Sequence, residues 1–138
     1  MKKEIIASLN ELDKVVDYLN TTLPENTVVF LRGDLAAGKT TLTQAIAKAK
    51  GIEGEVTSPT FSLQQCYAED LYHYDLYRID HEEFMNLGLF EEFEKPGWHM
   101  VEWGSDVLKS FLEGVGYNVV LIEIEPYEEK RKYTIESS

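Results

Sequence analysis

The chain has 138 residues, about the size of one domain, and 43% of them are hydrophobic, which excludes a disordered tail. Its 25 Asp and Glu residues outnumber its 13 Lys and Arg residues, giving a formal net charge of −12. Such a surface repels phosphate backbones, so unaided nucleic-acid binding is not expected. We expect a single domain over residues 1–138.

The single cysteine, Cys66, excludes an intrachain disulfide and fits a reducing compartment. The first residues, MKKEIIASLNELDK, contain no long apolar run, so neither a signal peptide nor a transmembrane helix is expected. We therefore expect a cytoplasmic protein without membrane contact.

The first half of the chain alternates strands and helices. The pattern predicts a short strand over residues 4–7, a helix over 9–23, a strand over 27–32 and a helix over 42–49. Ser8 and Glu11 form a capping-box pattern before the first helix, and Pro24 ends it. The strand over 27–32 (TVVFLR) is apolar on both faces, which is typical of a strand buried in a parallel sheet.

The second half continues this alternation. We expect strands over 61–67 and 71–77 that form a hairpin turning near residues 69–70, a strand over 98–103, a long strand over 117–125 and a last edge strand over 132–136. Asp80 marks one helix start, and Ser105 caps a helix that ends at Gly114. The alternation predicts an α/β fold, and the hairpin makes its sheet mixed.

The strongest motif is a phosphate-binding loop. Residues 33–40 match G-x-x-x-x-G-K-[ST] at every fixed position, through Gly33, Asp34, Leu35, Ala36, Ala37, Gly38, Lys39 and Thr40. In such a loop, backbone N–H groups wrap the β-phosphate, and the helix that follows points its positive end at the anion. We expect Lys39 to bridge the β- and γ-phosphates, Thr40 to ligate Mg²⁺ and Thr41 to reach the α-phosphate.

This motif predicts a P-loop NTPase-type three-layer sandwich, with a mostly parallel (mixed) central sheet flanked by helices. No N-K-x-D stretch occurs, so the usual guanine-specific contact is missing and ATP is the expected nucleotide. Small-molecule kinases of this fold need a lid that carries arginines. The arginines of this chain, Arg32, Arg78 and Arg131, do not form such a segment, which disfavours that class.

Three further residues are candidates for the nucleotide site. Glu102 ends an apolar strand and is the candidate Mg²⁺ anchor, the alternative being a surface glutamate at a strand end. Asp75 shares a strand face with His73 and is a candidate general base, whereas a lone histidine is more often structural. Thr60, in TSPTF, either lies near the γ-phosphate as in switch segments or belongs to a plain turn.

Four motifs together resemble one family. They are GDLAAGKTT over residues 33–41, TSPTF over 57–61, HYDLYR over 73–78 and VEW over 101–103. In this order they resemble the TsaE (YjeE) family, small bacterial P-loop ATPases of tRNA threonylcarbamoyladenosine (t6A) biosynthesis, and the resemblance covers about residues 1–125.

The resemblance implies a P-loop α/β fold that binds ATP and Mg²⁺ and hydrolyses ATP weakly alone. It also implies two partners, a threonylcarbamoyl-transferase subunit and its inactive paralogue, which modify adenosine 37 of tRNA, so that tRNA is met only through them. Site residues follow from matching motif positions. They are Lys39 and Thr40 for phosphate and Mg²⁺, Glu102 for the metal, Asp75 for catalysis, Trp103 for support of the site or a partner contact, Ser58 and Thr60 in the switch-like segment, and Ser8 beside the nucleotide base.

Ala36 departs from the family pattern, which has glycine there, and a left-handed backbone at this position would cost about 1 kcal/mol. Two other functions stay open from the sequence. One is a nucleotide-gated scaffold with negligible hydrolysis, and the other is a small-molecule kinase.

Overall fold

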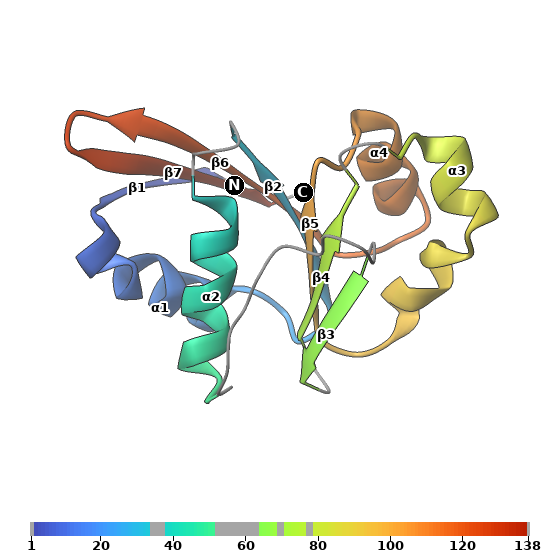
Figure 1. Cartoon of the computed structure of the whole chain (residues 1–138), viewed down its shortest axis with the longest axis horizontal. Coiled ribbons are helices and arrows are strands. Elements are labelled where there is room, and N and C mark those ends of the chain that lie inside the picture. Colours follow the sequence, from blue (N-terminus) through green and yellow to red (C-terminus); the bar gives the residue numbers. More distant parts are fainter. Residues whose placement is uncertain (1, 34–37, 52–63, 69–70, 77–78, 138) are drawn as a thin grey trace.

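A seven-stranded mixed sheet forms the centre of the molecule (Figure 1). The computed structural model describes residues 2–33, 38–51, 64–68, 71–76 and 79–137. The strands are β1 (Lys2–Ala7), β2 (Thr27–Arg32), β3 (Gln64–Ala68), β4 (Leu71–Asp75), β5 (Trp98–Glu102), β6 (Val119–Tyr127) and β7 (Lys130–Ser137), in the order β1-β7-β6-β2-β5-β4-β3. The four central strands, β6, β2, β5 and β4, are parallel, and antiparallel pairings flank them on both sides. The predicted mixed sheet is confirmed.

Helices cover both faces of the sheet (Figure 1). Helices α1 (Asp13–Thr22) and α2 (Lys39–Ala49) lie on one face, and α1 is preceded by a short 3₁₀ turn, η1 (Leu9–Glu11). Helices α3 (His81–Asn86) and α4 (Asp106–Gly114) lie on the other face with the 3₁₀ segment η2 (Leu89–Glu94). This is the predicted three-layer arrangement. None of the described helices is both long and apolar enough to cross a membrane.

Strand β2 shows why the chain needs helices on both faces. Its residues alternate between two buried clusters, with Val29 and Leu31 facing α1 and α2, and Val28 and Phe30 facing α3 and α4. All four are at most 1% exposed. A strand buried on both faces is expected to be apolar at successive positions, which explains the continuous VVFL run over residues 28–31.

Local signals predicted most helix starts correctly. The capping box at Ser8 is present, and Glu11 accepts from the Ser8 backbone N–H at 3.1 Å. The Asp80 carboxylate accepts from the Glu83 N–H at 2.8 Å, and the Ser105 hydroxyl accepts from the Leu108 N–H at 3.1 Å. The first helix differs from the prediction, because the chain winds as 3₁₀ before α1 begins at Asp13.

The hairpin of β3 and β4 is confirmed, with a register shift between Cys66 and Ala68, although residues 61–63, 69–70 and 77 lie outside the described ranges. The prediction of an edge strand over 132–136 is wrong. Strand β7 lies between β6 and β1, because Lys2–Ala7 pairs antiparallel along its outer side. This pairing joins the two ends of the chain and cannot be read from local pattern.

His99 and Tyr74 form a buried, hydrogen-bonded polar pair on the side of the sheet that α3 and η2 cover. His99 is 1% exposed, and its Nε2–H donates to the Lys95 carbonyl at 2.8 Å. Because that nitrogen carries the proton, Nδ1 accepts from the Tyr74 hydroxyl at 2.7 Å, and the Tyr72 ring stacks on the imidazole with centroids 4.6 Å apart. Burial lowers the pKa of His99 below its usual value, although the bond to Lys95 opposes the shift.

We predict that His99 makes folding pH-dependent below neutrality. The unfolded histidine takes up a proton near its ordinary pKa of 6.5, whereas the folded one does so only at lower pH. The contribution of the neutral His99 to the free energy of unfolding is therefore complete above the unfolded pKa of 6.5, and it is lost as the pH falls toward the lower pKa of the folded protein. His99→Gln should cost about 1–3 kcal/mol at pH 7.5 and less at pH 5.5, measured by urea unfolding of both proteins. A cost that does not change with pH would contradict this.

Candidate functional site

Three parallel strands end at one edge of the sheet, and their last residues form the candidate site. Strand β2 leads into Gly33, β5 ends at Glu102 and β4 ends at Asp75. The register places Asp75 opposite Glu102, and Leu31 of β2 opposite Glu102 on its other side. Ligands of open α/β sheets bind outside the carboxyl ends of the strands, so this edge is where a ligand site is expected.

Gly38 forms the entry of the phosphate loop into α2. Its φ is 102°, a left-handed conformation that glycine adopts at little cost. A Cβ at this position would also collide with the guanidinium of Arg131, which reaches over from β7. The backbone conformation therefore favours glycine here, whereas the arginine is the end of a flexible side chain that could move aside. Residues 34–37 of the loop (Asp34, Leu35, Ala36 and Ala37) lie outside the described ranges.

Lys39 is a buried cation at the first residue of α2, with 3% of its surface exposed. Its Nζ donates to the Gly33 carbonyl at 2.9 Å and lies 3.5 Å from the centroid of the Trp103 ring. A cation over an aromatic face is attracted by the ring quadrupole, by about 0.5–2 kcal/mol depending on how well the pair is shielded from water, and the Trp103 ring is half-buried. The ammonium and the amino end of α2 are the two groups of this edge that would attract an anion.

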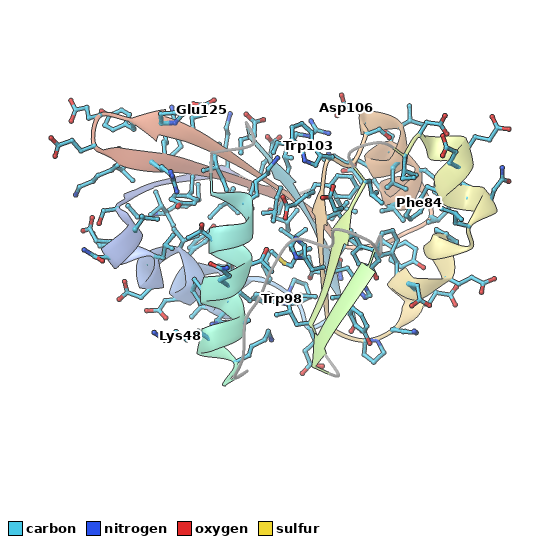
Figure 2. All side chains as sticks on the ribbon, viewed as in Figure 1. Lys48, Phe84, Trp98, Trp103, Asp106 and Glu125 are labelled. Carbon is cyan, nitrogen blue, oxygen red and sulfur yellow. The ribbon has the colours of Figure 1, made fainter. Side chains whose placement is uncertain are left out.

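Trp103 reaches Lys39 because the chain turns sharply after β5. Trp103 has a φ of 64°, which is unfavourable for a bulky residue, and Gly104 follows it against the buried Phe30 ring. The two tryptophans therefore lie at opposite ends of β5, Trp98 at its start and Trp103 just beyond its end (Figure 2). Nothing in the local sequence pattern indicates the Trp103 conformation.

Glu102 is a buried carboxylate, 4% exposed, and is not the surface glutamate that was the alternative interpretation. Its Oε2 is bonded to Nε2 of His73, which is fully buried on β4. Asp75 is two residues further along the same strand and is partly exposed. Sequence reasoning did not assign His73 to the site, although strand alternation already placed it on the same face as Asp75.

Of the remaining predicted site residues, Ser8, Thr40 and Thr41 lie in the described part of the chain and two others do not. Ser8 follows Ala7, which pairs with Arg131, so the Ser8 segment and Gly38 approach the same arginine. Thr40 and Thr41 lie in the first turn of α2. Ser58 and Thr60 lie outside the described ranges, as does Arg78. Arg32 forms an ion pair with Asp106 at the start of α4.

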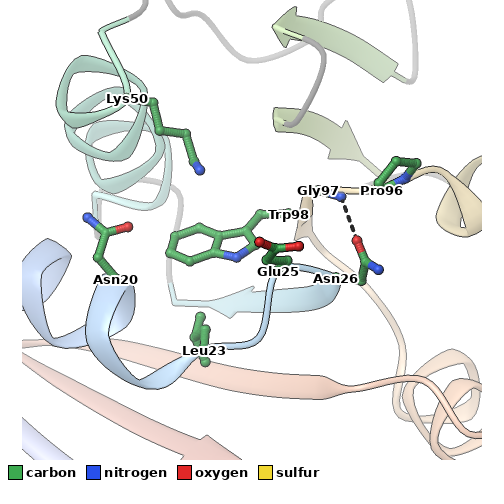
Figure 3. Close-up of a pocket in the computed structure, with 8 residues that line it drawn as sticks. All are labelled: Asn20, Leu23, Glu25, Asn26, Lys50, Pro96, Gly97 and Trp98. Atoms are coloured by element: carbon green, nitrogen blue, oxygen red, sulfur yellow. Dashed lines mark hydrogen bonds between the residues drawn. The ribbon is translucent and has the colours of Figure 1, made fainter.

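A pocket of about 230 Å³ opens at this edge, lined by Leu31, Arg32, Gly33, Lys39, Trp103 and Gly104. A larger pocket of about 450 Å³ lies at the opposite end of β2 and β5, lined by Asn20, Leu23, Glu25, Asn26, Lys50, Pro96, Gly97 and Trp98 (Figure 3). Its lining residues contact one another: the Asn26 side-chain oxygen accepts from the Gly97 backbone N–H at 3.0 Å, and the Lys50 ammonium lies 4.7 Å from the Trp98 ring centroid.

The sheet edge around the smaller pocket has the chemistry for an anion and a hard cation. Lys39 and the amino end of α2 suit phosphate oxygens. The donor set also fits Mg²⁺, because this ion keeps several waters and usually takes one or two carboxylates together with substrate phosphates. The buried Glu102 carboxylate, which precedes the pocket residue Trp103 in sequence, is such a ligand. Among the described residues no three His, Cys, Asp or Glu side chains gather as a protein-only metal site.

Gly104→Ala tests how tightly the turn after β5 is packed. The added Cβ would lie 2.5 Å and 2.7 Å from two Phe30 ring carbons, and Phe30 is fully buried. We expect a loss of about 1–3 kcal/mol in the free energy of unfolding, measured in urea. Gly114→Ala is the matched control, because nothing lies within 4 Å of its Cβ, and it should be neutral or stabilise by up to about 1 kcal/mol. Equal effects of the two changes would refute the close packing.

Comparison with known proteins gives consistent matches. Residues 6–133 match the family described as "Threonylcarbamoyl adenosine biosynthesis protein TsaE". A "tRNA threonylcarbamoyladenosine biosynthesis protein TsaE" from Synechocystis is 44% identical over 78 residues, which are 54% of this chain and 50% of the relative. The protein of the same name from Haemophilus influenzae is 36% identical over 108 residues, which are 75% of this chain and 66% of the relative.

The alignment with the Nostoc relative spans 57% of that protein, so the chain matches about half the length of the first relatives. Among solved structures, Bacillus subtilis YdiB superposes with a TM-score of 0.69 at 27% identity, covering 99% of this chain and 87% of that one. The whole described fold, and not only the phosphate loop, is therefore shared with a known structure.

Proposed function

The chain belongs to the family of the threonylcarbamoyl adenosine biosynthesis protein TsaE, and from this premise we propose that it is an ATP-binding and ATP-hydrolysing component of t6A synthesis at position 37 of tRNA. The relatives carry the name of the tRNA threonylcarbamoyladenosine pathway. The observation that supports nucleotide chemistry is the buried Lys39 at the start of α2, whose ammonium lies over the ring of Trp103, the residue that follows the buried carboxylate Glu102.

In this proposal Lys39 and the N–H groups at the start of α2 bind the phosphates of ATP. The Lys39 ammonium exchanges its contacts with the Gly33 carbonyl and the Trp103 ring for phosphate oxygens. Thr40 and Glu102 hold Mg²⁺, which neutralises charge on the transferring phosphate when bound. Asp75, at the same edge and partly exposed, accepts a proton from the attacking water.

We propose that the hydrolysis acts on a partner complex, the threonylcarbamoyl-transferase subunit with its inactive paralogue. The net charge of −12 supports contact with tRNA only through these partners. The alternative, a nucleotide-gated scaffold, shares the binding site and differs in having negligible turnover. The measurements below separate the two.

Nucleotide binding should change the fluorescence of Trp103, because its ring loses the Lys39 ammonium. Trp98→Phe leaves Trp103 as the only tryptophan and gives a clean signal. ATP and ADP titrations should show saturable changes, and Lys39→Ala should weaken binding by about 10- to 100-fold, as expected for a lost charge-assisted hydrogen bond. Unchanged affinity in Lys39→Ala would contradict phosphate binding by this lysine.

ATP hydrolysis is measured on the chain alone and with the two partner subunits. We expect slow turnover alone and stimulation by the partners. Asp75→Asn and Glu102→Gln should each lower turnover by about 100-fold or more while ATP still binds. Binding with no turnover under either condition would favour the scaffold, and a phosphorylated small molecule would favour a kinase.

A further inference from the structure

Burial of the Glu102 carboxylate requires a compensating donor. Placing an ionised carboxylate away from water is costly unless it is hydrogen-bonded or paired, and Glu102 is only 4% exposed. Its Oε2 is bonded to Nε2 of His73. An ionised carboxylate can only accept, so Nε2–H of the imidazole is the donor.

His73 is well suited to fix another side chain. It is fully buried, and its strand β4 is paired on both sides, with Gln65 of β3 and with Met100 of β5. Glu102 is two residues after Met100 on β5 and is opposite Asp75. The donor and the acceptor therefore come from neighbouring strands of one sheet, and the strand pairing fixes the backbone positions from which the two side chains meet.

The bond restricts the rotation of the Glu102 carboxylate. A glutamate has three side-chain torsions, and an unrestrained one loses rotamer entropy when it binds a ligand. Because Oε2 is already hydrogen-bonded to His73, the Glu102 side chain loses this rotamer entropy during folding and not when the ligand binds. In metal sites, partners that orient a ligand in this way typically change metal affinity by about 10- to 100-fold when removed.

We propose that His73 is a positioning residue that orients Glu102 for Mg²⁺, so that the ion and the nucleotide bind as a unit. This inference rests on the proposed function, because nucleotide and Mg²⁺ binding at this edge are proposed there. It adds a residue that touches neither phosphate nor metal. The role we assign to it acts through Glu102, and a change in the Mg²⁺ requirement separates that role from a general loss of stability.

The test compares His73→Phe with His73→Gln. Phenylalanine keeps the volume of the ring and removes the N–H donor, whereas the glutamine amide places an N–H near the position of Nε2. Binding of ATP is followed through Trp103 fluorescence in EDTA and then against Mg²⁺ concentration. We expect unchanged binding in EDTA for both variants, a Mg²⁺ requirement about 10-fold higher for His73→Phe, and most of this shift reversed in His73→Gln.

His99→Gln is the matched control. His99 is the other fully described buried histidine, and it lies on the opposite face of the sheet among Tyr72, Tyr74 and Phe93. It should lower stability and leave the Mg²⁺ requirement unchanged. Should His73→Phe fail to fold, His73→Asn takes its place, because the shorter amide cannot reach Glu102, and the same Mg²⁺ shift is expected.

A double-mutant cycle gives the sharpest outcome. In a Glu102→Gln background, His73→Phe should not change the Mg²⁺ requirement further, because the residue through which it acts is gone. Additive shifts would overturn the proposal, as would a wild-type requirement in His73→Phe or an equal shift in His99→Gln. A parent protein that binds no nucleotide overturns the proposed function and this inference together, whereas Mg²⁺-dependent binding that ignores His73→Phe overturns only the inference.

Discussion

Burial of two opposite charges at one edge of the sheet is the constraint on which the site depends. Lys39 and Glu102 are 3% and 4% exposed, and each must replace lost water with protein contacts. Lys39 has the Gly33 carbonyl and the Trp103 ring, and Glu102 has His73. These contacts come from three strands and one helix, so the site forms only when the whole sheet edge is assembled.

The parallel order of the central strands is what brings these groups together. Strands β4, β5 and β2 are adjacent and end at the same edge, which places a carboxylate-bearing strand between the phosphate loop and Asp75. The two buried clusters hold this order from both sides, and Phe30 occupies the space below Gly104. Packing under the turn after β5 therefore determines where Trp103 points.

The sequence predicted the features that depend on neighbouring residues and did not predict the contacts between distant segments. Some features depend only on neighbouring residues, and those described match the predictions: the GDLAAGKT loop, the capping residues Ser8 and Ser105, and the apolar VVFL run of β2. Glu102 was found because parallel strands share their carboxyl edge. By contrast, three features join segments that are far apart in the chain. They are the hydrogen bond from His73 to Glu102, the approach of Arg131 to Gly38 and the position of β7 inside the sheet. Periodicity carries no information on such pairings.

The adjacent residues Glu102 and Trp103 couple the acidic and basic halves of the site. The Glu102 side chain is held from β4, while the left-handed backbone of Trp103 turns the next side chain toward Lys39 on α2. A rotation about this short segment would move a carboxylate and an aromatic ring at once. The tight fit of Gly104 against Phe30 opposes such a rotation, so this buried contact behind the site supports the geometry of both halves. The VEW triplet thus acts as one structural unit, in which the position of the Glu102 carboxylate and that of the Trp103 ring depend on the same backbone segment.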